Sequence, residues 1–148
     1  MNDMIRAQKA VENYIAFFNS LDRLSINRLT AVAAPNICFI DPFNKASGYD
    51  SVMAVLTHFI DNVQTPHFDV KSIAFSGNTC FVSWDFSGVL TASGKAWRFT
   101  GVSELTLDGS YRIMHHQDYW DAATHFYEKI PVIGYILRLI KRKISILK

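Results

Sequence analysis

The sequence predicts an α+β fold in which a strongly curved, mixed or antiparallel sheet wraps around N-terminal helices. Two observations support this prediction. Up to about residue 63, apolar side chains recur every three or four positions, which is typical of amphipathic helices. From Thr65 to Trp120 the apolar period changes to two, which is typical of strands. At 148 residues and 49% hydrophobic composition, the chain fits one domain with a substantial core.

The first part of the chain predicts three helices and one short strand. The helices are expected at residues 4–21, 24–33 and 52–63. Pro35 should stop the second helix, and residues 36–41 should form the strand. Residues 43–48 are expected to be a loop, with Ser47 or Asp50 as the N-cap of the helix that follows.

Four long strands joined by tight turns are predicted next. Their residues are 67–76, 79–91, 95–107 and 111–119. Gly77, Gly94 and Gly109 lie in the turns, so the strands should form an antiparallel meander. These strands are long for a globular protein, which indicates strong curvature and a cone-shaped cavity beside the helices.

The C-terminal segment is expected to be helical again. Residues 121–129 form the first part, Pro131 and Gly134 interrupt it, and residues 135–147 form a last helix. Residues 131–148 are amphipathic, with an apolar side, a basic side and no acidic residue. The basic residues are Arg138, Lys141, Arg142, Lys143 and Lys148. This helix can pack on the body or on a second subunit, or it can lie on an anionic membrane surface.

Asp41 is the first candidate for a functional residue. It ends the apolar run 37–40 and directly precedes Pro42. An apolar environment disfavours a charged carboxylate and raises its pKa, which suits a general base in a pocket. The alternative is a carboxylate that caps the turn at Pro42 and faces water. Tyr14, on the apolar side of the first helix, is either a donor in the cavity or a core residue.

The last predicted strand carries two further ionisable candidates. Met114, His116, Asp118 and Trp120 alternate and should share one face of the sheet. Positions two apart on a strand are separated by about 7 Å, so His116 and Asp118 can act on one substrate. If His116 and Asp118 lie near Asp41, the three side chains would form a group for acid–base catalysis. The alternative is that His116 and Asp118 are a buried polar pair that stabilises the strand.

Large side chains on the neighbouring strands are predicted to line the same cavity. Trp97, Phe99 and Ser103 share a face of one strand, and Trp84 lies on the adjacent one. With Trp120 they form the expected ligand-binding wall. Simple alternation turns Asp85 away from this wall.

Composition argues against several classes of function. A net charge of +2 gives no field that would attract nucleic acid. The five histidines are too scattered for a metal site, and no phosphate-binding glycine loop is present, so no metal or cofactor is expected. Cys38 and Cys80 are interpreted as buried thiols. Because no signal peptide and no membrane-spanning stretch is recognised, we expect a cytoplasmic protein.

Three stretches give the chain a family resemblance. They are Tyr14-Ile15-Ala16 followed 27 positions after the Tyr by Asp41-Pro42, the helix after Gly48, and Asp118-Tyr119-Trp120-Asp121. In this order they resemble the nuclear transport factor 2-like superfamily, in its SnoaL-like and ketosteroid-isomerase-like branch. The resemblance covers about residues 4–128, which indicates a domain over 1–130. The basic amphipathic helix over 131–148 is either part of the same domain or an interaction tail. It implies a cystatin-like α+β roll and a homodimer.

The resemblance also implies roles for individual residues. In ketosteroid isomerases the matching tyrosine, here Tyr14, is an oxyanion donor, and the matching aspartate, here Asp41, is the base. Ser103 stands where that family has a second oxyanion acid. In limonene epoxide hydrolases the matching catalytic aspartate is Asp118. That family also has an Arg and an Asp on the third strand; here their places hold Ser83 and Asp85, and the match would turn Asp85 inward.

Three hypotheses of function follow. The first is a proton-transfer enzyme, of isomerase or cyclase type, that acts without a cofactor on a small apolar carbonyl compound. Its catalytic residues would be Asp41, Tyr14, His116 and Asp118. The second is a non-catalytic domain that binds a small apolar ligand. The third is a dimeric interaction module whose tail, residues 131–148, docks on a membrane or a partner.

Overall fold

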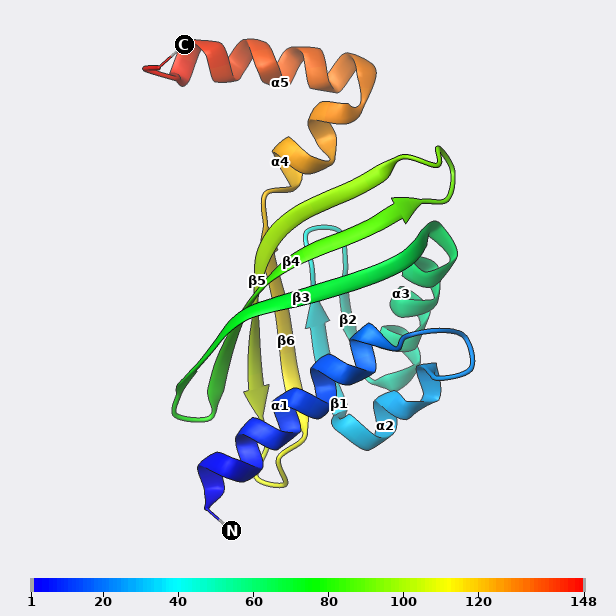
Figure 1. Ribbon diagram of the computed structural model, residues 1–148, viewed down its shortest axis with the longest axis vertical. Coiled ribbons are helices and arrows are strands. Elements are labelled where there is room, and N and C mark those ends of the chain that lie inside the picture. Colours follow the sequence, from blue (N-terminus) through cyan, green and yellow to red (C-terminus); the bar gives the residue numbers. More distant parts are fainter. Residues whose placement is uncertain (1, 148) are drawn as a thin grey trace.

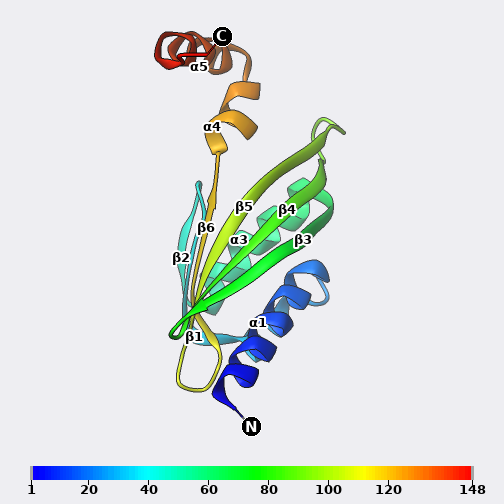
Figure 2. The same cartoon turned by 60° about the vertical axis from the view of Figure 1, so that its left-hand side comes forward.

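The computed structural model describes residues 2–147 and contains one curved sheet with six strands. The strand order is β2-β1-β6-β5-β4-β3 (Figures 1 and 2). All neighbours are antiparallel except β1 and β6, which are parallel, so the sheet is mixed. The strands are β1 (Ala33–Ile40), β2 (Lys45–Ser47), β3 (Val63–Ser76), β4 (Thr79–Leu90), β5 (Ala96–Leu107) and β6 (Ile113–Trp120). The predicted antiparallel meander of four long strands, β3 to β6, is confirmed.

Helices pack on the sheet and extend beyond it (Figure 2). They are α1 (Asp3–Asn19), η1 (Ile26–Arg28), α2 (Leu29–Val32), α3 (Tyr49–Asn62), α4 (Ala122–His125), η2 (Tyr127–Lys129) and α5 (Pro131–Ile144). Val11 of α1 and Val52 of α3 are fully buried in one core with Cys80 of β4 and Leu105 of β5. The predicted α+β class, with helices packed on a curved sheet, is therefore confirmed.

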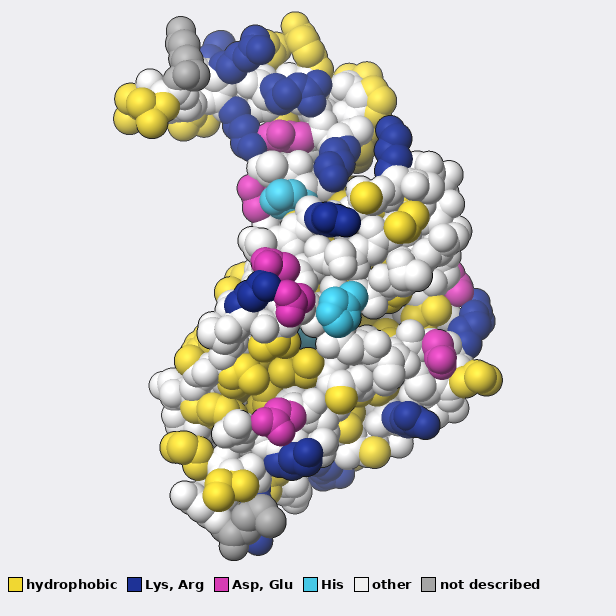
Figure 3. All heavy atoms as spheres, in the orientation of Figure 1, with side chains coloured by type: hydrophobic (Ala, Val, Ile, Leu, Met, Phe, Trp, Pro, Cys, Tyr) yellow, Lys and Arg dark blue, Asp and Glu magenta, His cyan; other side chains and the backbone are white. Residues whose placement is uncertain are grey.

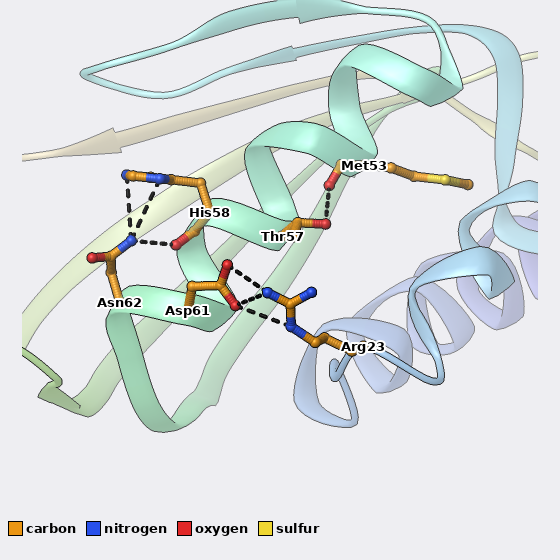
Figure 4. Close-up of polar contacts among 6 residues, drawn as sticks. All are labelled: Arg23, Met53, Thr57, His58, Asp61 and Asn62. Atoms are coloured by element: carbon orange, nitrogen blue, oxygen red, sulfur yellow. Dashed lines mark hydrogen bonds and ion pairs between the residues drawn. The ribbon is translucent and has the colours of Figure 1, made fainter.

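The helical layer is also tied together at its surface. Arg23, in the segment after α1, forms an ion pair with Asp61 of α3 (Figure 4). Its Nη2 lies 2.6 Å from Asp61 Oδ1 and 2.7 Å from Asp61 Oδ2. On the same helix, Thr57 donates to the Met53 carbonyl and Asn62 to the His58 carbonyl (Figure 4). The Arg23–Asp61 ion pair links α3 to the segment after α1, whereas the bonds of Thr57 and Asn62 lie within α3 itself.

Alternation along the central strands decides which side chains face the helices. On β4, Val82, Trp84 and Phe86 are buried, whereas Asp85 is half exposed and lies 3.4 Å from Lys71 on the outer face. The prediction that Asp85 faces outward is confirmed. An inward Asp85, as in the epoxide hydrolases, is wrong for this chain because strict alternation holds along β4.

A bulge adjusts the register of β6. Leu107 pairs with Ile113 and Thr106 with His115, so one extra residue, Met114, is accommodated on β6. Ile113 and His116 are consequently both buried. The expected inward position of Met114 is taken by Ile113, because the bulge shifts the alternation before His116.

The first connections differ from the prediction. The second helix is only η1 and α2, and the chain is already extended at Ala33, so Pro35 lies inside β1. The predicted loop contains β2, which pairs with β1. Neither Ser47 nor Asp50 caps α3, because Gly48 is the N-cap, with a φ of +83° that favours glycine.

The C-terminal helix projects from the end of the sheet (Figure 1). It begins at Pro131, because proline fits the first helical position, where no amide donor is needed. Gly134 lies inside it and contacts Glu128: a Cβ there would be 2.0 Å from the Glu128 carbonyl oxygen. Of the alternatives for the apolar side of α5, packing on the body is not found, since that side is exposed among the described residues, and packing on a second subunit or on a membrane stays a prediction.

Candidate active site

A small pocket lies between α1 and the inner face of β3 to β6. Its cavity volume is about 40 Å³, which is room for roughly one or two water molecules. Phe18 of α1 and Phe68 of β3 stand on its apolar wall. Figure 3 shows hydrophobic side chains gathered between α1 and the β3–β4 turn, on the side where this pocket lies. The polar members of the lining are Tyr14, Ser103, His116 and Asp118.

These polar side chains form one line of hydrogen bonds. Tyr14 Oη lies 2.9 Å from His116 Nδ1, and His116 Nε2 lies 2.7 Å from Asp118 Oδ1. A carboxylate only accepts, so His116 donates from Nε2, and in the neutral imidazole Nδ1 then accepts from the Tyr14 hydroxyl. Each bond of this line therefore donates in the direction of Asp118, and the line begins at Tyr14, which is more than 100 positions away in the sequence.

A second line of hydrogen bonds reaches the same carboxylate oxygen. Trp84 Nε1 donates to Ser103 Oγ at 2.9 Å, and Ser103 Oγ donates to Asp118 Oδ1 at 2.5 Å. An indole N–H can only donate, so it fixes the direction of both bonds. Adjacent positions on β5 and β6 create this arrangement, because Ser103 pairs directly with Asp118 in the sheet.

The two carboxylate oxygens of Asp118 therefore differ in their hydrogen bonds. Oδ1 accepts from both Ser103 and His116, whereas Oδ2 has no hydrogen-bond partner among residues 2–147. The side chain is 14% exposed, and it lines the pocket. Asp118 is therefore held rigidly by one oxygen while the other is able to accept a hydrogen bond or a proton from a bound molecule.

Burial controls the ionisation of Tyr14. Its side chain is 2% exposed, and desolvation, with a smaller contribution from the negative charge of Asp118, raises the pKa of the Tyr14 hydroxyl well above its usual value. The hydroxyl therefore stays protonated at any physiological pH and acts as a donor.

Asp41 lies outside this group. Its Oδ1 accepts from the backbone amides of Phe43 and Asn44, both at 2.7 Å, and its Oδ2 accepts from the Asn44 side chain at 3.2 Å. The carboxylate closes the turn between β1 and β2 and is not part of the pocket lining. The expected position of Asp41 in the pocket is corrected, because the amides of the turn satisfy both of its oxygens.

The predicted aromatic wall is divided between two places. Trp84 and Ser103 line the pocket, as expected. Trp97, Phe99 and Trp120 instead form a neighbouring cluster, in which Phe99 stacks on Trp120 with ring centroids 4.1 Å apart. Trp97 Nε1 donates to the His125 carbonyl at 2.9 Å, so the start of the C-terminal segment packs against this cluster.

Other wall residues were not predicted from the sequence. Phe18 lies one helical turn after Tyr14 and therefore shares its face of α1. Phe68 and Val70 alternate on β3 and face the pocket. The helical spacing of Phe18 from Tyr14 and the alternation of Phe68 and Val70 could have predicted these positions.

Neither a metal cluster nor a membrane-spanning helix is found in the part of the chain that the structure describes. No group of three or more His, Cys, Asp or Glu side chains there is arranged to hold a metal ion. No helix among these residues is long and apolar enough to cross a membrane.

Solved structures with the same fold come from several bacteria. One is a protein of unknown function from Burkholderia pseudomallei, of the nuclear transport factor 2-like fold, with 16% identity, a TM-score of 0.71, and coverage of 80% of this chain and 93% of that one. A candidate SnoaL-like polyketide cyclase from Jannaschia sp. CCS1 has 13% identity, a TM-score of 0.72, and coverage of 81% and 88%.

A third similar structure contains a ligand. It is a protein of ketosteroid isomerase-like fold from Catenulispora acidiphila in complex with trimethylamine, with 14% identity, a TM-score of 0.69, and coverage of 78% of this chain and 88% of that one. At such identities these likenesses establish the fold alone. No curated protein matches the chain. The sequence model of the SnoaL-like domain matches residues 11–116, and the chain therefore belongs to the SnoaL-like family.

Proposed function

We propose that the pocket binds a small apolar compound with a carbonyl group and that Asp118 moves a proton on it. The observation that carries this proposal is the asymmetry of Asp118: Oδ1 accepts two hydrogen bonds, and Oδ2 has no partner among the described residues. The apolar wall around it supports the same assignment, because a carboxylate base acts best where water is scarce.

The proposed step is an enolisation. Asp118 Oδ2 takes a proton from the carbon next to the carbonyl group, the C–H bond breaks, and its electron pair forms the enolate. The Tyr14 hydroxyl, which stays protonated, turns from His116 Nδ1 to the developing oxyanion. His116 and Ser103 hold the carboxylate in place through Oδ1. Return of the proton from Asp118 to another carbon completes an isomerisation. In a cyclisation, the enolate carbon attacks a second carbonyl of the same molecule, the C=O π bond breaks, and the new alkoxide takes the proton from Asp118.

The small cavity supports a small ligand. With a volume of about 40 Å³, it admits a larger molecule only if wall residues such as Phe18 and Phe68 move. A similar structure binds trimethylamine, a small molecule, and the likenesses include a candidate polyketide cyclase and a candidate isomerase of the SnoaL-like family from Agrobacterium tumefaciens.

Deuterium exchange tests the proposal directly. Cyclopentanone is larger than the cavity and enters only if wall residues such as Phe18 and Phe68 move. It is incubated in D2O with the protein, and loss of its α-proton signal is followed by NMR. The protein should accelerate exchange, and Asp118→Asn should lower the catalysed rate by about 10²- to 10⁴-fold. Asn can still accept at Oδ1, so the variant should fold. An unchanged rate in a folded Asp118→Asn variant would reject the role of this carboxylate.

Non-catalytic binding is the second candidate, and the mainly apolar lining of the pocket favours it. It predicts that cyclopentanone shifts amide signals of pocket residues in the NMR spectrum without any exchange. Those shifts should survive in Asp118→Asn. The homodimer, the cytoplasmic location and the division into a domain over 1–130 and a tail over 131–148 remain predictions. A membrane contact through this tail is a further proposal.

A further inference from the structure

The C-terminal helix α5 is held to the preceding helical segment, α4 and η2, by its polar side. Lys141 Nζ lies 2.5 Å from Glu128 Oε1 and 2.7 Å from Thr124 Oγ1. Arg138 Nη1 donates to the Glu128 carbonyl at 2.9 Å, and Gly134 contacts the same carbonyl group. These contacts involve only α4, η2 and α5, and they set the rotation of α5 about its own axis.

The opposite side of α5 is apolar and uncovered. We define the α5 apolar face as Val132, Ile133, Ile136, Leu139, Ile140 and Ile144. Each of these side chains is at least 41% exposed, and Ile146 beyond the helix is 95% exposed. Figure 3 shows hydrophobic and basic side chains together at this end of the molecule. A helix that turns its polar side to its own domain and its apolar side outward is arranged to meet a second apolar surface.

The position of Lys143 indicates what that surface is. Val132, Ile136, Leu139 and Lys143 follow one another at helical spacing, so Lys143 lies within the α5 apolar face. Against a second protein surface of the same kind, its ammonium group would be buried without a partner, which is costly. At a lipid surface the long side chain can extend to the phosphate groups while its stem stays in the apolar layer.

Charge favours the same partner. Residues 131–147 contain four basic residues and no acidic one, and Lys143 and Arg142 form no ion pair among the described residues. Basic residues next to an inserted apolar face are attracted to anionic lipids, whereas two copies of this helix would repel each other. At 14 residues, α5 is about 21 Å long, which is shorter than the roughly 30 Å of a bilayer core and suits a position along the surface.

We propose that α5 docks the protein on an anionic membrane surface, with its apolar face in the lipid and with Lys143 and Arg142 at the phosphate level. Because α5 lies at one end of the molecule, across its long axis (Figure 1), the sheet and its pocket stand away from the membrane.

Vesicle co-sedimentation of the full chain tests this proposal. The protein should bind vesicles of phosphatidylcholine with phosphatidylserine, and much less those of phosphatidylcholine alone. Ile136→Asp should weaken binding at least about tenfold, because it places a charge in the lipid-facing side. Lys143→Gln should weaken it by about fivefold through the loss of one charge. Leu24→Asp is the matched control, because Leu24 is 93% exposed and lies outside α5.

Each outcome decides the question. Loss of binding in Ile136→Asp, with binding retained in Leu24→Asp, supports the proposal. Absence of binding to the anionic vesicles, equal binding to both vesicle types, or equal binding by Ile136→Asp overturns it. Analytical ultracentrifugation without vesicles adds one more outcome: a dimer that Ile136→Asp converts to a monomer, in a protein that ignores vesicles, assigns the face to a second copy and overturns the membrane proposal.

Discussion

Replacement of Tyr14 by phenylalanine tests the buried line of hydrogen bonds through stability. The variant keeps the ring and removes only the hydroxyl, which is buried and lies 2.9 Å from His116 Nδ1. The lost hydrogen bond contributes about 0.5–1.5 kcal/mol, and the unsatisfied nitrogen adds to this cost. We expect the free energy of unfolding to fall by about 1–2 kcal/mol at pH 8, with a decrease in Tm of roughly 2–8 °C.

The pH dependence of this difference follows from the pKa of Tyr14. Its pKa is raised in the folded protein, so above about pH 10 the unfolded chain loses this proton while the folded protein keeps it. The stabilising effect of the raised pKa is complete below pH 10 and decreases by about 1.4 kcal/mol for each pH unit above it. The Tyr14→Phe variant has no hydroxyl at this position and therefore no such loss. The stability difference between the two proteins should shrink above pH 10 and nearly vanish around pH 11.

Urea denaturation at pH 8, 10 and 11, followed by tryptophan fluorescence, measures both effects in one series. The other tyrosines and the lysines are common to the two proteins and cancel in the difference. Equal stability at pH 8 would refute the contribution of the hydrogen bond. A difference that stays constant up to pH 11 would refute the protonated, desolvated state of Tyr14.

Two further substitutions test neighbouring features. Ser103→Ala should lower the free energy of unfolding by about 1–3 kcal/mol, measured by urea denaturation, because it leaves Trp84 Nε1 buried without an acceptor; a change under about 0.5 kcal/mol would contradict this. Gly134→Ala should displace α5, since its Cβ would lie 2.0 Å from the Glu128 carbonyl oxygen. Faster amide exchange over residues 131–144 would report this displacement, and an unchanged exchange rate there would count against it.

The alternation of side chains along a strand explains which positions of β4 and β6 were predictable from the sequence. His116 and Asp118 were placed on one face because period two along a strand is a local property, and the family resemblance implied that this face is the inner one. Asp85 was turned outward by the same alternation. The bulge at Met114 was not predictable from the period, since it depends on the pairing of β6 with β5. The convergence of Tyr14 and Ser103 on one pair of residues depends on tertiary packing and likewise required the structure.

Asp41 and the C-terminal helix show where local patterns were interpreted incorrectly. The sequence Asp-Pro-Phe-Asn is a turn signal, with Asp at the first position and Pro at the second, and such an aspartate accepts amides of the turn. That signal was outweighed by the apolar strand before Asp41. In α5, Pro131 was interpreted as a helix breaker, although proline is well tolerated at the first helical position.

The most direct test of the proposed chemistry compares two aspartate variants in one assay. Asp118→Asn and Asp41→Asn are matched changes, and in both the amide oxygen can still accept the hydrogen bonds made to Oδ1. The measurement is the rate of deuterium exchange into cyclopentanone catalysed by each folded variant. The proposal predicts a rate near that of the unmodified protein for Asp41→Asn and a loss of about 10²- to 10⁴-fold for Asp118→Asn. The reverse pattern, with exchange lost in Asp41→Asn and retained in Asp118→Asn, would contradict it.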